Sequence, residues 1–435
     1  MTTALEMPQG LPSLPDGWDY QVLESLLEPK GIAYGIVQPG TYEPSGVPIV
    51  RVKDLRGGRI ERGDALRVSP EIEAKYDRTR LRGGEVLLSL VGSVGEVAVV
   101  PEDLAGWNVA RAIAVMRPVS VNSDWLKLYL RSDLAQAFMR DWQTTTVQAT
   151  LNLRDLRRVP IAVPPAHERE AIAEVLGALD DKIALNDRIA STARELARAA
   201  MEEIWGKGGI TSLVRSETAV PAGWRRTTLG ALCAAGGGAI QTGPFGSQLH
   251  ASDYVDAGIP SVMPQDIGDN LISEEGIARI TAADAERLSK YLLTEGDIVY
   301  SRRGDVKRRA LVRKYEAGWL CGTGCLRVRV GTPTEALFIS YYLGEREIQE
   351  WIAQHAVGAT MPNLNTAILG DVPVVLPPGD EVRRVNERLT GLDVTVAHLQ
   401  HENRTLADLR DTLLPQLLSG KLRVRDAVRA VEEVV

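Results

Sequence analysis

The feature of this 435-residue chain that most constrains its fold is an internal repeat. Short strings from the first half return in the same order in the second half, at an offset that stays between about 206 and 213 residues. Chance similarity would not keep this order over so many segments, so we infer a duplicated structural unit. The matching strings are Pro15–Trp18 with Pro221–Trp224, Gly46–Val50 with Gly258–Val262, Gly84–Ser89 with Gly296–Ser301, Gly106–Trp107 with Gly318–Trp319, and Val163–Pro165 with Leu376–Pro378.

Each copy of the repeat has two parts. The first part mixes short β-rich runs and short helical patterns with turns marked by Gly and Pro, and the second part, after a double proline, has the pattern of one long helix. We therefore predict an α+β chain: two similar mixed, β-rich globular domains separated by two long antiparallel coiled-coil helices, with internal pseudo-two-fold symmetry. The expected segments are a first domain at 1–164, a first helix at 165–206, a second domain at 207–377 including a linker at 207–220, a second helix at 378–424 and a tail at 425–435.

Both long helices carry apolar residues at alternating spacings of four and three, the seam of a coiled coil. The seam itself does not decide whether the helices run parallel or antiparallel, and two unrelated amphipathic surface helices remain the alternative. Asn186 and Asn403 lie on the seam, where a polar pair can fix the register, and Arg410 departs from the apolar pattern. The residues predicted to pair the helices are Ile172, Leu176, Leu179, Ile183, Val385, Leu389, Leu392 and Val396.

Composition indicates an ordinary soluble protein and gives no sign of a metal site. The first ten residues lack the pattern of a secretory signal and no apolar run is long enough to cross a membrane, so we expect a cytoplasmic protein. Cys321 and Cys325 lie close together, but no second Cys or His pair is near enough in sequence to complete a zinc site. The net charge of −7 excludes a uniformly basic nucleic-acid-binding protein and leaves local basic patches possible.

One such patch lies in the second half, where seven cationic residues fall between Arg302 and Lys314 around Gly304. Arginine can hold a phosphate with two hydrogen bonds or pair with the edge of guanine, so the run predicts DNA contact. A solvated hairpin with ordinary surface charge is the alternative. The predicted DNA-binding residues of the second domain are Gln241, Thr242, Ser247, Gln248, Gln265, Arg302, Arg303, Lys307, Arg308, Arg309, Asn363 and Asn365.

The matching segments of the first domain are less basic. A DNA contact there must use scattered polar and charged groups rather than one dense run. The predicted DNA-binding residues of the first domain are Tyr34, Gln38, Arg51, Lys53, Ser89, Ser93 and Arg111.

Motifs for catalysis are missing from the sequence. It contains no phosphate-binding loop of the type G-x-x-x-x-G-K-[ST], no Asn/Asp-Pro-Pro-aromatic tetrapeptide of an adenine methyltransferase and no H-E-x-x-H. We therefore predict a non-catalytic chain that binds neither metal nor cofactor.

Several strings resemble the specificity subunits of type I restriction–modification systems. The strings are Pro15–Trp18, Gly31–Gly40, Thr242–Leu249, Pro264–Ile267 and Leu413–Leu422, and the resemblance covers about residues 14 to 424.

The resemblance implies that each β-rich unit is a target recognition domain for one half of a bipartite DNA sequence. The helices would set the spacer length and dock two modification subunits, with restriction subunits completing the complex. S-adenosylmethionine, ATP and magnesium would then be bound by the partners. The alternatives are a coiled-coil protein-interaction scaffold and a DNA-binding protein that acts alone.

Overall fold

The structure is a computed structural model that describes residues 11–145, 149–205, 210, 214, 220–245, 248–358 and 361–432. The chain divides into two compact units. The first unit combines the residues up to Asn186 with those from His401 onward, and the second unit runs from Asp187 to Gln400. Each long helix therefore contributes one part to each unit.

The first unit is built on a four-stranded antiparallel sheet with strand order β2-β10-β7-β8. A three-stranded sheet, β6-β3-β9, pairs β3 with β9 in parallel, and β1 pairs with β13. Trp125 of α2 shares a buried core with Val86 and Leu88 of β7. The elements are β1 (Asp19–Val22), β2 (Leu27–Tyr34), β3 (Val47–Val50), β6 (Leu66–Val68), β7 (Val86–Ser89), β8 (Val97–Val99), β9 (Asn108–Val109), β10 (Ile113–Pro118), β13 (Pro160–Val163), α2 (Ser123–Leu130), α3 (Asp133–Asp141) and α4 (Leu153–Leu156).

The second unit repeats the central part of this topology and adds one strand to each of the two larger sheets, β18 pairing with β21 in parallel. Its main sheet has the order β15-β23-β20-β21-β18, its second sheet the order β16-β19-β17-β22, and β14 pairs with β24. Strand β17 pairs with β22 in parallel, as β3 does with β9 in the first unit. The elements are β14 (Arg225–Thr228), β15 (Ile240–Thr242), β16 (Tyr254–Val255), β17 (Ile259–Val262), β18 (Asp269–Asn270), β19 (Arg279–Ile280), β20 (Ile298–Ser301), β21 (Arg309–Leu311), β22 (Leu320–Cys321), β23 (Cys325–Val328), β24 (Pro373–Leu376), α9 (Pro333–Tyr342), α10 (Arg346–His355) and α11 (Thr366–Gly370).

Two repeated landmarks of the sequence contact each other in both units. Gly17 adopts φ +82°, and a β-carbon built on it would lie 3.7 Å from Pro165, the second residue of the double proline. Gly223 has φ +84° and the same relation to Pro378 at 3.3 Å. Each Gly-Trp string thus packs where the chain enters its long helix, which explains why the strings recur together.

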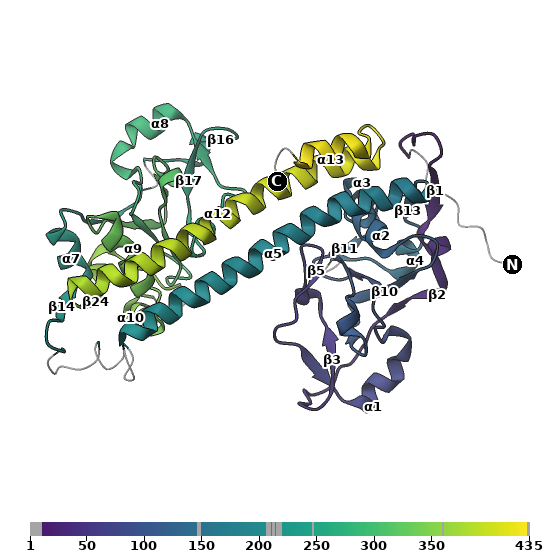
Figure 1. The fold of residues 1–435 in the computed structure, drawn as a ribbon, viewed down its shortest axis with the longest axis horizontal. Helices are drawn as coiled ribbons and strands as arrows, with labels where there is room; N and C mark the ends of the chain where they lie inside the picture. Colours follow the sequence, from purple (N-terminus) through teal and green to yellow (C-terminus); the bar gives the residue numbers. More distant parts are fainter. Residues whose placement is uncertain are drawn as a thin grey trace. The chain divides into compact units, whose positions relative to one another are not determined.

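The two long helices are α5 (Ala166–Trp205) and α12 (Gly379–Leu418), and in each unit their parts pack together (Figure 1). In the first unit, Asn186 Nδ2 donates to Asn403 Oδ1 at 2.9 Å, and Arg410 Nη1 donates to Asp180 Oδ1 at 2.9 Å. Moving backward along α5 from 186 to 180 corresponds to moving forward along α12 from 403 to 410. The paired parts therefore run antiparallel in this unit.

The second unit shows the same direction of pairing. Glu203 accepts a hydrogen bond from Arg388 Nη1 at 2.6 Å, whereas the alanines at 190 and 193 pack against Val396 and Leu399. Small alanines of α5 thus face larger apolar side chains of α12 in this unit. Of the eight residues predicted to pair the helices, six are buried and Ile183 and Leu392 are partly buried.

The tail contains an element that the sequence analysis did not predict. Residues Val424–Glu432 form helix α13, whose Ala427 is fully buried in the core of the first unit. Val424 and Val431 pack against the same core. These apolar residues lie on one face of a helix only nine residues long, too short a pattern to stand out beside the 40-residue helices.

Shortening a buried side chain in the helix seam of the second unit should lower the stability of the protein considerably. Leu389 of α12 is fully buried in a core with Ala197 and Met201 of α5. We expect Leu389→Ala to lower the free energy of unfolding by roughly 2–5 kcal/mol, since it leaves a cavity in a packed interface. Urea unfolding followed by circular dichroism measures this. Val394→Ala is the control, because Val394 lies on the same helix with 61% of its surface exposed, and an equal loss there would contradict the packing argument.

The carboxyl of Glu345 should make the free energy of unfolding depend on pH. Burial raises the pKa of this carboxyl to about 7, and Trp205 Nε1 donates to it at 3.3 Å. In the unfolded chain this carboxyl has its ordinary pKa of 4.5, so above that pH the unfolded state ionises more readily than the folded state. The free energy of unfolding therefore falls as pH rises from 4.5 to about 7. Glu345→Gln keeps an acceptor for Trp205 and removes this loss, giving a gain on the order of 2 kcal/mol at pH 8. Thermal unfolding at pH 8 and pH 5, with Glu350→Gln as control, should show most of the gain at pH 8; an equal gain at both would contradict it.

Candidate nucleic-acid interface

Both units place a turn at the same point of their main sheet, immediately after β7 and after β20. Gly92 and Gly304 adopt φ of +78° and +77°, a region that favours glycine. The amide of Gly92 donates to Ala149 O at 3.1 Å, and that of Gly304 donates to Pro362 O at 3.1 Å. The turn is therefore held against a second loop in the same way in both copies.

A third loop joins this cluster through a glycine that could not carry a side chain. A β-carbon on Gly35 would lie 2.2 Å from Val109 O, and one on Gly243 would lie 2.1 Å from Gly322 O. These close approaches bring the ends of β2 and β15 against the loops before β10 and β23. We call the two sets of loops the loop clusters: residues 34–38, 90–95, 110–112 and 149–152 in the first unit, and 242–245, 302–308, 322–324 and 361–365 in the second.

Four cations of the predicted basic run point outward from the second loop cluster. Arg303, Lys307 and Arg308 are exposed, and Arg302 is half-buried with its guanidinium 5.8 Å from the ring centre of Phe245. Arg308 Nε forms a weak contact of 3.4 Å with Asp305, one residue beyond the turn glycine. These exposed cations can meet phosphates without first giving up strong internal ion pairs.

Arg309 was predicted to contact DNA as part of the basic run, but it is buried. The residue is 3% exposed, and its guanidinium donates to Ser340 O at 2.7 Å and pairs with Asp269 at 3.2 Å. Arg313, the next cation along, is also buried. Arg309 begins the packed strand β21 and Arg313 follows directly after it, so both charges lie in the interior. The prediction of DNA contact is therefore wrong for Arg309.

The polar residues predicted in the second domain fall into two groups. Gln265 and Asn365 are exposed beside the cations, and the backbone oxygen of Gln265 accepts from Arg308 Nη1 at 3.5 Å. Gln241 and Gln248 accept hydrogen bonds from Arg327 at 2.5 Å and from Tyr291 at 2.8 Å, so their amides also shape the loops.

The remaining predicted residues of the second domain have mixed environments. Thr242 and Asn363 are half-buried in the loop cluster, and Asn363 bridges to Arg303 through the backbone. Asn363 Oδ1 is buried without a hydrogen-bond partner among the described residues. Ser247 lies outside the described residues.

The first loop cluster has fewer charges and more neutral polar groups. Tyr34, Gln38, Ser93 and Arg111 are exposed at its loops, and Lys53 is exposed beside it. The sequence-based difference between the two domains is thus visible at equivalent places in the fold.

Two predicted residues of the first domain have structural partners. Arg51 pairs with Asp54 at 3.0 Å and is only half-exposed, so its guanidinium is engaged within its own turn. Ser89 is fully buried, and its hydroxyl bonds Ser93 O and the amide of Glu96. The prediction of DNA contact is therefore wrong for the Ser89 side chain, which instead shapes the turn that exposes Ser93.

Exposed apolar side chains near the loop clusters were not singled out from the sequence. Phe245 is 54% exposed and Met361 is 62% exposed in the second unit, and Val37 is 44% exposed at the position of Phe245 in the first. Apolar side chains can contact the thymine methyl or wedge between bases. The available signal was the string Thr242–Leu249, whose only aromatic residue is Phe245.

The described residues contain no group of three or more His, Cys, Asp or Glu side chains arranged to hold a metal ion. The three cysteines are free and buried, and burial raises the pKa of the Cys321 thiol to about 12. Among the described helices, none combines the length and hydropathy needed to span a bilayer.

Comparison with known proteins finds similarity to one class of DNA-related proteins. The type I restriction modification DNA specificity domain matches residues 34–193. The type I restriction enzyme EcoBI specificity subunit of Escherichia coli is 28% identical over 162 residues, which are 37% of this chain and 34% of that relative. The MjaIX specificity subunit of Methanocaldococcus jannaschii is 22% identical over 425 residues, 95% of each chain.

A solved structure agrees with the fold. The S subunit of a type I restriction–modification system from M. genitalium has a TM-score of 0.59 at 16% identity, covering 95% of this chain and 99% of that one. Residues 34–193 are thus similar to the DNA specificity domain of type I restriction–modification systems. Over nearly its whole length the chain is similar to type I restriction–modification specificity subunits, in sequence at 22% identity to the MjaIX subunit and in fold to the M. genitalium subunit.

Proposed function

We propose that this chain is the sequence-specific DNA-binding subunit of a type I restriction–modification complex. The observation that carries the proposal is the pair of equivalent loop clusters. Each lies at the main sheet of its own unit, has glycines at equivalent positions and exposes polar or cationic side chains. Two such clusters on one chain suit a bipartite DNA target, with one half bound by each unit.

The two units would hold DNA with different chemistry. The second loop cluster exposes Arg303, Lys307 and Arg308, groups that suit phosphate and guanine contacts. The first cluster offers Tyr34, Gln38 and other mainly neutral groups and would depend more on hydrogen bonds to base edges. Different side chains on one scaffold are what two different half-sites require.

The long helices would separate the two recognition domains as a coiled coil and set the number of bases between the half-sites. They would also dock the modification subunits. Leu185, Ile189 and Leu196 support docking, because these exposed apolar side chains lie at helical spacing along one face of α5. Exposed apolar residues in such a stripe are typical of a protein-interaction surface.

Catalysis is assigned to the partners in this proposal. Two modification subunits would bind S-adenosylmethionine and methylate the DNA, and restriction subunits would use ATP and magnesium. This chain would recognise the DNA sequence and would contribute no catalytic group. The complex would work in the cytoplasm, where its DNA substrate lies.

Salt-dependent DNA binding by the full chain, purified with its co-expressed modification subunits, tests the proposal. We expect the complex to bind a duplex with the sequence that it methylates in its host at least roughly a thousandfold more tightly than a scrambled duplex. Affinity should fall steeply as salt rises, because phosphate contacts release counterions. Equal affinity for both duplexes would contradict the proposal, and an assembled complex without DNA binding would favour a protein-interaction scaffold.

A further inference from the structure

Each long helix carries a buried aspartate at the same position of the repeat. Asp180 of α5 and Asp393 of α12 differ by 213 in residue number, the offset that relates the two helical seams. They are 6% and 7% exposed. A buried carboxylate in a helix seam is costly unless cations surround it, so its presence in both copies requires an explanation.

In the first unit, Asp180 is surrounded by cations from two elements. Arg131, directly after α2, lies 3.2 Å from Oδ2, and Lys127 of α2 lies 3.8 Å from the same oxygen. Arg410 of α12 donates to Oδ1 at 2.9 Å. This carboxylate therefore connects the globular part of the unit to both helices, and it accounts for the departure of Arg410 from the apolar seam.

In the second unit, Asp393 has the same role with different partners. Arg313 Nη2 donates to Oδ1 at 2.9 Å and Arg313 Nε donates to Oδ2 at 3.2 Å, a bidentate pair. The same guanidinium donates to Asn270 O, and Tyr341 OH donates to Oδ1 at 3.4 Å. The cation now comes from the chain just after β21 and not from the helix that corresponds to α2.

The aspartate occurs at the same position in both copies of the repeat, but its cationic partners differ between the copies. Gly344 is the counterpart of Arg131, and a β-carbon on it would lie 1.9 Å from the guanidinium of Arg309. Arg410 has Ala197 as its counterpart on α5, so the second unit has no cation at that seam position. What both copies keep is an anionic anchor on the helix that holds an arginine of the globular part.

An anchor of this kind determines orientation more than stability. Burying both charges costs about as much as their attraction returns, whereas the directional hydrogen bonds fix one geometry. In the second unit, the anchored Arg313 follows the outward-pointing Arg308 by only five residues, with β21 between them. The anchor thus fixes the basic loop relative to α12 through a short, rigid segment.

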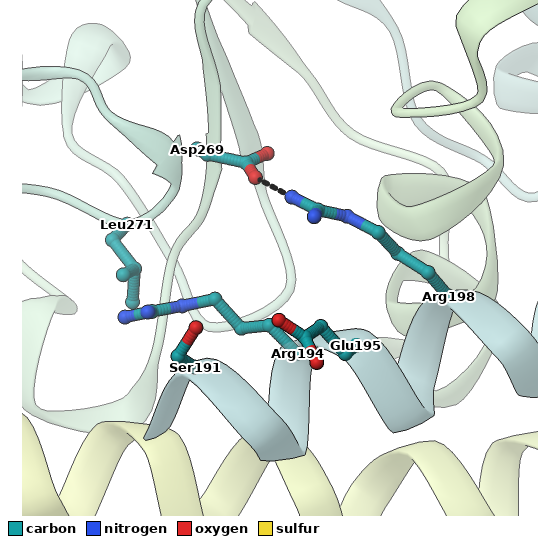
Figure 2. Close-up of a pocket in the computed structure, with 6 residues that line it drawn as sticks. All are labelled: Ser191, Arg194, Glu195, Arg198, Asp269 and Leu271. Carbon is teal, nitrogen blue, oxygen red and sulfur yellow. Dashed lines mark hydrogen bonds and ion pairs between the residues drawn. The ribbon is translucent and has the colours of Figure 1, made fainter. Parts of the chain in front are cut away.

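The open groove beside this network does not provide a second anchor. It is lined by Ser191, Arg194, Glu195, Arg198, Asp269 and Leu271, and Figure 2 shows Arg198 directed at Asp269 across it. The side chain of Asp269 is 52% exposed, so water screens its ion pairs with Arg198 and Arg309, unlike the buried pair of Arg313 and Asp393.

We propose that Asp180 and Asp393 are positioning residues: each fixes the orientation of its unit's loop cluster on the helix pair and thereby restricts the spacer length that the chain accepts. This proposal rests on the proposed function. Neither carboxylate contacts DNA, so its effect should appear in the choice between spacers and not in the choice of bases.

The test measures affinity of the complete complex for duplexes that carry both half-sites with the native spacer, with one base pair fewer and with one more. We expect Asp393→Asn to lower the preference for the native spacer roughly tenfold, which is about 1.4 kcal/mol. Asp180→Asn should do the same. Glu387→Gln on α12 and Glu174→Gln on α5, both exposed carboxylates, should leave the preference unchanged.

A double variant, Asp393→Leu with Arg313→Leu, separates positioning from folding. It removes both buried charges, so its thermal stability should approach that of the wild type while its spacer preference stays low. If the aspartate variants lose affinity equally for all three spacers, the inference is wrong. A wild-type complex that shows no preference among the spacers would contradict the proposed function itself.

Discussion

We expect replacement of Arg303, Lys307 and Arg308 with alanine to lower the affinity of the assembled complex for DNA roughly a hundredfold near physiological salt, because three exposed cations proposed to bind phosphates would be lost. The slope of log affinity against log salt should become less steep by about three. Both quantities come from one fluorescence-anisotropy titration series at several salt concentrations. The loss should be similar for target and scrambled duplexes if the three side chains bind phosphates, and larger for the target if any of them contacts a base.

A charge-matched variant provides the control for this experiment. Arg225, Arg346 and Arg383 are exposed cations of the same unit outside the loop cluster. Their replacement with alanine changes the net charge equally and should alter affinity by less than about threefold. If the two triple variants weaken binding to the same degree, overall charge and not the loop cluster would be the cause.

Removing one heptad from both long helices is expected to change the accepted spacer. Deleting seven residues from α5 after Asn186 and seven from α12 before Asn403 keeps the antiparallel seam in register. The pair becomes shorter by about 10 Å, the rise of seven helical residues. Because base pairs follow each other at about 3.4 Å, we expect a motif with the same half-sites and roughly three fewer bases between them, or no recognition at all.

Insertion of one heptad at the same two positions is the matched opposite change. It should lengthen the spacer by a similar number of bases, again with unchanged half-sites. Methylome sequencing of hosts that carry each version measures both. A motif with the original spacer after either change would contradict the spacer role of the helices.

The helices and the repeat could be predicted from sequence because both depend on local, periodic patterns. The alternating spacing of apolar residues identified a seam in which Leu176, Ala197 and Leu389 are indeed fully buried. The direction of pairing could not be derived from the seam, since it depends on which residues meet across it. It became visible only in long-range contacts such as that between Asn186 and Asn403.

The candidate site was only partly predictable because a run of like charges does not show which way each side chain points. Arg308 and Arg309 are neighbours in sequence, but Arg308 is exposed and Arg309 is buried against Asp269. Arg309 begins strand β21, whose three residues are all buried, and its partner carboxylate lies 40 residues away in sequence. Arg410 was noticed as an irregularity of the seam, yet its partner Asp180 could be assigned only from the fold.

Sequencing of methylated bases in a host that expresses this chain with its modification subunits tests the central claim most directly. The account predicts one motif made of two different specific parts with a fixed number of unspecified bases between them. It also predicts that exchanging residues 220–377 for the corresponding segment of another family member changes only one of the two parts. A single uninterrupted motif, or two parts at variable separation, would contradict the account.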